Sequence, residues 1–143
     1  MSIERICQRA VDVAELGESV QTVAERMRQR TVGCLVIVDQ DRYPLGIVTD
    51  RDIVVRGLAE GKNLDNASVS ELMTKQVRTV RDDASVNDAL ELMNSAEVRR
   101  VAVVNASDEL VGIVSLGDIS IKSDKDTKVG QTVESISGAP PNN

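Results

Sequence analysis

Histidine, phenylalanine and tryptophan are absent from this sequence of 143 residues, and Tyr43 is its one aromatic residue. Histidine is the commonest general acid–base group and metal ligand, so its absence disfavours most enzymatic and metal-binding functions. The lack of aromatic stacking platforms disfavours sequence-general binding of single-stranded nucleic acid. The hydrophobic core must therefore be built from aliphatic side chains.

Cysteine and long apolar runs are also scarce. Cys7 and Cys34 show neither CxxC spacing nor histidine partners, so we predict no metal site and interpret both as ordinary buried or half-buried thiols. The longest apolar stretch, near residues 32–38, is far shorter than the ~18 residues of a membrane span. The first residues also lack the apolar run of a signal peptide. We therefore expect a cytoplasmic protein without a membrane segment.

Acidic side chains outnumber basic ones. The 23 acidic and 17 basic side chains give a formal net charge of −6 and an isoelectric point near 4.7. Such a surface repels phosphate backbones, which argues against non-specific binding to DNA or RNA.

The chain contains an internal sequence repeat. Residues 1–57, moved forward by 66 positions without a gap, fall on residues 67–123. Matching pairs include Ser19 with Ser85, Met27 with Met93, and Val38 with Val104. A half of this size buries too little surface to be stable alone. We therefore expect the halves to fold together about a pseudo-two-fold axis, with two equivalent sites in the clefts between them.

Each half contains the pattern of an amphipathic helix. Apolar residues recur at i, i+3, i+4 and i+7, the spacing of one helix face. They are Val20, Val23, Ala24 and Met27 in the first half, and Val86, Ala89, Leu90 and Met93 in the second.

Strands and shorter helices complete the pattern. Apolar runs at residues 35–38 and 45–48, and again at 101–104 and 111–114, predict one hairpin per half. A second helix is expected over residues 50–59, ending at Gly61, with its counterpart beginning at Leu116. Short helices are expected at residues 3–7 and 69–73. A further amphipathic segment around residues 129–136 precedes a tail, residues 138–143, whose composition predicts disorder.

One motif stands at the same place in both halves: G-I-V-T-D-R-D at residues 46–52 and G-I-V-S-L-G-D at residues 112–118. A hydroxyl residue ends a strand, and an aspartate follows three positions later in a helix. One interpretation is a capping box with a purely structural role. The other is a ligand site, in which the helix start and a cation (Arg51, with Arg56 or Lys122) hold a phosphate while the aspartate accepts hydrogen bonds from a ribose diol.

With the doubled motif and the upstream S-V-x-x-A-x-x-x-M helix pattern, the chain resembles the CBS-domain pair family, named for cystathionine β-synthase. The resemblance covers roughly residues 1–123. It implies an α+β fold of two tandem β-α-β-β-α subdomains packed about a pseudo-two-fold axis. The repeats are expected at residues 1–65 and 66–137.

The resemblance also assigns site residues by position. The ribose-binding aspartate of the family corresponds to Asp52 and Asp118, and its hydroxyl neighbour corresponds to Thr49 and Ser115.

Two further positions differ between the halves. A ligand contact on the first strand, often threonine in the family, corresponds to Thr79 in the second half but to Val13 in the first. Next to each aspartate, Arg51 in the first half corresponds to Gly117 in the second. Thr79 makes the second site the more complete one, whereas Arg51 gives the first site the better phosphate partner.

The function implied is a non-catalytic regulatory module for energy sensing. It is expected to bind an adenine nucleotide (AMP, ADP or ATP) or a related adenosyl ligand, with no catalytic cofactor and no metal. The alternative is a dimeric interaction or assembly module with one or both clefts empty. In either case we expect a homodimer, because the helix after residue 50 is broadly apolar, and an unidentified protein target.

Overall fold

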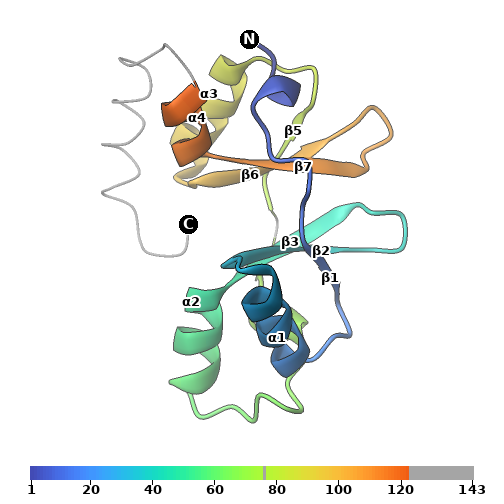
Figure 1. Ribbon diagram of the computed structural model, residues 1–143, viewed down its shortest axis with the longest axis vertical. Coiled ribbons are helices and arrows are strands. Elements are labelled where there is room, and N and C mark those ends of the chain that lie inside the picture. Colours follow the sequence, from blue (N-terminus) through green and yellow to red (C-terminus); the bar gives the residue numbers. More distant parts are fainter. Residues whose placement is uncertain (76, 123–143) are drawn as a thin grey trace. The chain divides into compact units, whose positions relative to one another are not determined.

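The computed structural model describes residues 1–75 and 77–122, and the chain divides into two compact units (Figure 1). The first-repeat unit is Asp12–Val77. The second-repeat unit combines Met1–Val11 with the chain from Arg78 onward. The boundaries between the units differ from the repeat boundaries expected from the sequence, because each unit includes the first residues of the other repeat. The repeat boundaries themselves remain predictions.

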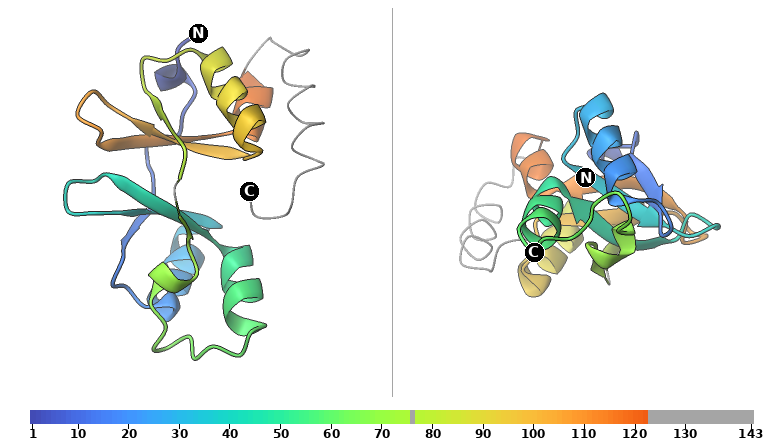
Figure 2. Two further views of the ribbon diagram at one scale, coloured as in Figure 1. Left: turned by 180° about the vertical axis from the view of Figure 1, so that it is seen from behind. Right: turned by 90° about the horizontal axis from the view of Figure 1, so that it is seen from below.

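The first-repeat unit contains a four-stranded sheet in the order β1-β2-β3-β4. Strands β1 and β2 are parallel, and the remaining neighbours are antiparallel. Two views show α1 and α2 on the same side of this sheet (Figures 1 and 2). The elements are β1 (Val13–Glu15), α1 (Val20–Arg30), β2 (Cys34–Val38), β3 (Pro44–Thr49), α2 (Asp50–Asp52) continuing as the π-helix η2 (Ile53–Leu58), the 3-10 helix η3 (Val69–Glu71) and β4 (Thr74–Lys75).

The second-repeat unit repeats this order with a three-stranded sheet, β5-β6-β7. Strand β5 is parallel to β6, and β6 is antiparallel to β7. Its elements are the 3-10 helix η1 (Ile3–Arg5), β5 (Thr79–Arg81), α3 (Val86–Ala96), β6 (Arg100–Val104), β7 (Leu110–Ser115) and α4 (Leu116–Lys122). The α+β class and the twofold order of strand, helix, two strands and helix are confirmed.

The N-terminal segment of the chain completes the second-repeat unit. Gln8 bridges Ile113 on the free edge of β7, as Thr74 in β4 pairs with Ile47 in β3. Gln8 and Thr74 are 66 positions apart, as are Ile47 and Ile113, so the two pairings are equivalent in the repeat. The glycine of each G-I-V motif makes this approach possible. A Cβ on Gly46 would lie 2.6 Å from the Thr74 carbonyl oxygen, and one on Gly112 would lie 2.8 Å from Cys7 Sγ.

The amphipathic helices and hairpins expected from the sequence are confirmed. Ser19 and Ser85 cap α1 and α3, and both helices turn their apolar residues inward. The cores are exclusively aliphatic apart from methionine. The most buried side chains are Val20, Val23, Leu35, Ile37, Val48, Val69 and Leu72 in the first-repeat unit, and Ile3, Ala89, Leu90, Met93, Val101, Val103, Val114 and Ile119 in the second.

The helix expected over residues 50–59 differs from an α-helix. After Asp52 it widens into the π-helix η2, in which the Ala59 amide donates to the Val54 carbonyl, five residues back. Gly57 lies where a Cβ would come within 3.0 Å of Leu64 and 3.1 Å of Leu72, so glycine permits close packing there. The helix ends before Gly61, whose φ of 74° confirms its expected role as the stop residue.

The short helices are 3-10 turns over Ile3–Arg5 and Val69–Glu71, shorter than expected. The amphipathic segment and tail predicted beyond residue 122 lie outside the described residues. Among the residues described, no helix combines the length and apolar character that a membrane span needs.

Candidate functional site

Both copies of the motif form a complete capping box at the junction of a strand and a helix. In the first-repeat unit, Thr49 Oγ1 accepts from the Asp52 amide at 3.1 Å, and Asp52 Oδ2 accepts from the Thr49 amide at 2.9 Å. In the second, Ser115 Oγ accepts from the Asp118 amide at 3.0 Å, and Asp118 Oδ2 accepts from the Ser115 amide at 2.9 Å. Both capping boxes expected from the motif are therefore present, and they leave the choice between a purely structural role and a ligand site open.

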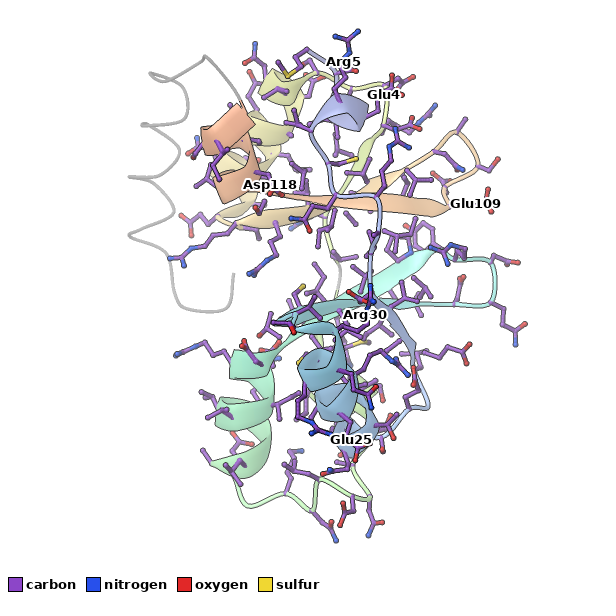
Figure 3. The ribbon with its side chains drawn as sticks, viewed as in Figure 1. Glu4, Arg5, Glu25, Arg30, Glu109 and Asp118 are labelled. Atoms are coloured by element: carbon purple, nitrogen blue, oxygen red, sulfur yellow. The ribbon has the colours of Figure 1, made fainter. Side chains whose placement is uncertain are left out.

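The cap uses only one oxygen of each carboxylate, and the second oxygen distinguishes the two junctions. Asp52 is 1% exposed, and its Oδ1 is buried without a hydrogen-bond partner among the described residues. Asp118, which lies where β7 meets α4 (Figure 3), is half-buried, and its Oδ1 accepts a 3.4 Å bond from Gln8 Nε2. A buried carboxylate oxygen without a donor is costly, by about 1–3 kcal/mol. The Asp52 junction is therefore the one whose polar groups are incompletely satisfied.

The first-strand positions lie across the sheet from the capping boxes. Val13 pairs with Val36, which pairs with Ile47, two residues before Thr49. Thr79 occupies the equivalent place, opposite Ala102. Neighbouring strands are separated by about 4.8 Å, so each first-strand residue is two strands, or about 10 Å, from the strand that carries the capping box. That span suits an elongated ligand rather than a single ion.

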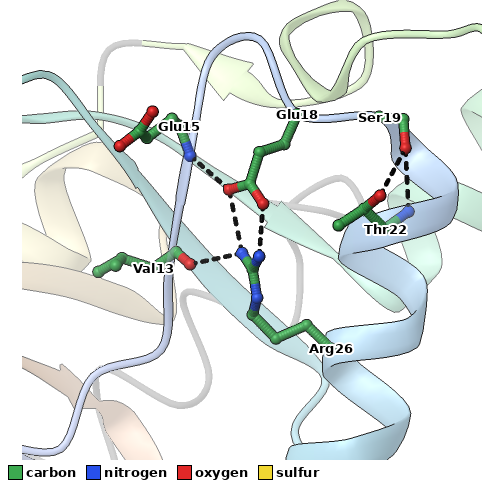
Figure 4. A network of polar contacts seen from close by, with 6 residues as sticks. All are labelled: Val13, Glu15, Glu18, Ser19, Thr22 and Arg26. Carbon is green, nitrogen blue, oxygen red and sulfur yellow. Dashed lines mark hydrogen bonds and ion pairs between the residues drawn. The ribbon is translucent and has the colours of Figure 1, made fainter.

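A polar network fixes the backbone at Val13 (Figure 4). Arg26 pairs with the Glu18 carboxylate through two nitrogens and donates to the Val13 carbonyl at 2.9 Å. Glu18 also accepts from the Glu15 amide at 2.8 Å. The hydrogen bonds from Arg26 lower the pKa of the Glu18 carboxyl, against the opposing effect of burial. The second repeat has Ala84 and Leu92 at the positions of Glu18 and Arg26, so this network is specific to the first repeat.

The cations expected from the sequence are only partly available. Arg51 is exposed and forms no ion pair within residues 1–75 and 77–122. Arg56 instead donates to the Leu72 and Met73 carbonyls at 3.2 and 3.4 Å, so it holds the segment after η3. Gly117 is exposed and adds no charge. The side chain of Lys122 lies outside the described ones.

Two arginines that the sequence analysis missed lie at the second junction. Arg100 is the β6 residue directly opposite Ser115, so their side chains share one face of the hairpin. The Arg99 carbonyl accepts a 2.8 Å bond from the Leu116 amide, which fixes Arg99 beside the start of α4. Both side chains are exposed. The 66-residue shift aligns them with Gly33 and Cys34, and that comparison alone could have revealed them.

The first junction carries a second carboxylate, Asp50, beside Gly33, the residue that corresponds to Arg99. The Asp50 amide donates to the Gly33 carbonyl at 2.9 Å. The Asp50 carboxylate lies over Gly33, where a Cβ would be 3.0 Å from its Oδ2. Any larger side chain at position 33 would press on this carboxylate.

The cysteines show no site of their own. Cys7 and Cys34 are half-buried and form no disulfide, and burial raises the pKa of the Cys7 thiol. The expectation of half-buried thiols is confirmed. The described residues contain no group of three or more histidine, cysteine, aspartate or glutamate side chains that could hold a metal ion.

The chain belongs to the CBS domain family, whose model matches residues 3–58 and 69–123. An uncharacterized protein of Methanopyrus kandleri is 34% identical over 119 residues, a stretch that covers 83% of this chain and 61% of that protein. Hypoxic response protein 1 of Mycobacterium tuberculosis is 38% identical over 103 residues, which cover 72% of this chain and 71% of that protein.

Solved structures share the fold. A hypoxic response protein I structure with two coordinated zinc ions is 32% identical, covers 86% of this chain and 99% of its own, and has a TM-score of 0.76. The CBS domain pair of protein MJ0100, solved with 5′-methylthioadenosine and S-adenosyl-L-methionine, is 28% identical, covers 85% and 98% of the two chains, and has a TM-score of 0.73.

Proposed function

We propose that this chain is a non-catalytic regulatory module that binds an adenine nucleotide or a related adenosyl ligand at its two strand–helix junctions. The observation that carries the proposal is the Asp52 carboxylate, whose Oδ1 is buried and unpaired in the described part of the chain. A vicinal ribose diol supplies two hydroxyl donors to a carboxylate of this kind. The MJ0100 pair, bound to two adenosyl compounds, supports the same ligand class.

The residues around each junction support binding rather than catalysis. Asp52 and Asp118 both use an oxygen to cap a helix, so neither carboxylate is placed as a mobile proton carrier. The whole sequence contains no histidine to replace them. Ligand binding would therefore act by changing how the module contacts another polypeptide.

We also propose that the module acts as a homodimer. On η2, Val54, Val55 and Leu58 are 53%, 39% and 64% exposed, whereas Ile53 is buried. Three neighbouring aliphatic side chains on one exposed helix suit a protein interface. The same face supports a second candidate function, an assembly module whose junctions bind nothing.

Thermal unfolding in the presence of AMP, ATP or S-adenosyl-L-methionine separates these two functions. A ligand that binds only the folded chain stabilises it by about 2.7 kcal/mol at a concentration one hundred times its dissociation constant. We expect a concentration-dependent rise in melting temperature with at least one of the three compounds. A melting temperature that none of them changes, at millimolar concentration, would contradict the sensor and leave the assembly module.

A further inference from the structure

The two junctions carry opposite net charge. At each junction we compare five positions, the aspartate among them, at the end of the hairpin and in the first turn of the helix. In the first-repeat unit they are Gly33, Cys34, Asp50, Arg51 and Asp52; in the second they are Arg99, Arg100, Leu116, Gly117 and Asp118. The first set thus contains two carboxylates and one guanidinium group, whereas the second contains two guanidinium groups and one carboxylate.

At the first junction the negative charge is oriented and incompletely satisfied. Asp50 Oδ2 lies over Gly33, and its Oδ1 accepts from the Arg51 amide at 2.9 Å, so the carboxylate is held in place. The Arg51 guanidinium forms no ion pair with it among the described residues. The buried Oδ1 of Asp52 adds an acceptor that lacks a donor. A phosphate near these oxygens would be repelled, whereas a hydroxyl or a cation would be attracted.

At the second junction the carboxylate is already engaged and the cations are available. Gln8 donates to Asp118 Oδ1, and the cap uses Oδ2. Neither Arg99 nor Arg100 forms an ion pair within residues 1–75 and 77–122. Guanidinium groups bind phosphate through paired, charge-assisted hydrogen bonds. A nucleotide phosphate carries a charge of about −1.5 to −2 at neutral pH, so two arginines suit it.

We infer that the two junctions sort adenosyl ligands by charge: the Asp118 junction takes the phosphorylated nucleotide, and the Asp52 junction takes an uncharged or cationic adenosyl compound without phosphate. This inference rests on the proposed function. It predicts two ligands per chain that do not compete. The contacts of the two junctions assign phosphate recognition to Arg99 and Arg100 and disfavour it beside Asp50.

Calorimetric titration of the full chain tests this division, with AMP and 5′-methylthioadenosine as probes. Each should bind once per chain, and saturation with one should leave the affinity for the other unchanged. The double variant Arg99→Gln/Arg100→Gln should weaken AMP at least about tenfold, the effect of losing one charge-assisted hydrogen bond, and leave 5′-methylthioadenosine unaffected. Asp52→Asn should do the reverse.

A matched control removes two exposed guanidinium groups from other elements. Arg5→Gln/Arg28→Gln makes the same change in net charge and should alter neither affinity by more than about twofold, because charges in solvent are screened beyond ~10 Å. Competition between the two probes, or unchanged AMP affinity in Arg99→Gln/Arg100→Gln, would overturn the division while leaving the sensor function intact. If neither probe binds the parent chain, the sensor function fails and the division fails with it.

Discussion

Replacing Asp52 by asparagine separates the two roles of this side chain. The amide oxygen of asparagine can still accept from the Thr49 amide, so the capping box at the start of α2 is retained. The amide nitrogen then takes the position of the buried, unpaired Oδ1. A ribose diol loses its charged acceptor, whereas the fold loses only an oxygen that had no partner.

The two effects differ in size. A buried amide nitrogen without a partner costs about 1–3 kcal/mol, which is no more than the cost of the buried carboxylate oxygen that it replaces. The free energy of unfolding should therefore change by less than about 1 kcal/mol, or a few degrees in melting temperature for a chain of this size. A charge-assisted hydrogen bond contributes about 1.5–3 kcal/mol, so the affinity for 5′-methylthioadenosine should fall about tenfold to a hundredfold.

Urea unfolding and calorimetric titration of Asp52→Asn provide both numbers. The matched control is Asp88→Asn in α3, because Asp88 forms the same capping box with Ser85 at an exposed site that we assign no ligand. Both variants should be similar in stability, and only Asp52→Asn should bind weakly. The reasoning is refuted if Asp52→Asn unfolds more easily by 3 kcal/mol or more, a value beyond the loss of a cap of about 2 kcal/mol, and binds like the parent.

Three further predictions concern stability and assembly. Because Arg26 lowers the pKa of Glu18, the pair stabilises the fold above the ordinary glutamate pKa of 4.5, and this contribution is lost as the pH falls through the lowered pKa. In urea unfolding, Glu18→Gln should therefore be less stable than the parent at pH 7 by about 1 kcal/mol. The two proteins should be equally stable in strong acid. Gly46→Ala places a Cβ 2.6 Å from a backbone oxygen and should cost about 1–3 kcal/mol in the same assay, whereas Gly17→Ala, with nothing within 4 Å, should cost nothing. Leu58→Lys should convert a sedimenting dimer into a species of 15.5 kDa, and a parent chain that already sediments as a monomer would contradict the homodimer.

Local structure was predictable because the repeat supplied every pattern twice. The helix starts at Ser19 and Ser85, both hairpins and the stop at Gly61 follow from residues close in sequence. Even the strained backbone recurs in register, since Thr31 and Glu97 both end a helix with a φ of 55°. Sequence patterns of this kind report short-range chemistry, which is why they were reliable here.

Long-range pairing was not predictable in this way. Nothing local shows that Gln8 joins Ile113, because the partners are separated by most of the chain. The close approach of Gly57 to Leu64 and Leu72 in η2 likewise involves residues that lie beyond the helix. Arg100 lies outside the motif, and only the pairing of β6 with β7 brings it opposite Ser115.

A crystal structure of the chain grown with AMP and 5′-methylthioadenosine tests the central claim most directly. The account predicts ribose hydroxyl oxygens within about 2.6–3.2 Å of a carboxylate oxygen of Asp52 and of Asp118. It also predicts the phosphate beside Arg99 and Arg100. A structure in which neither compound is bound at these junctions, or in which the ribose lies away from both aspartates, would contradict the account.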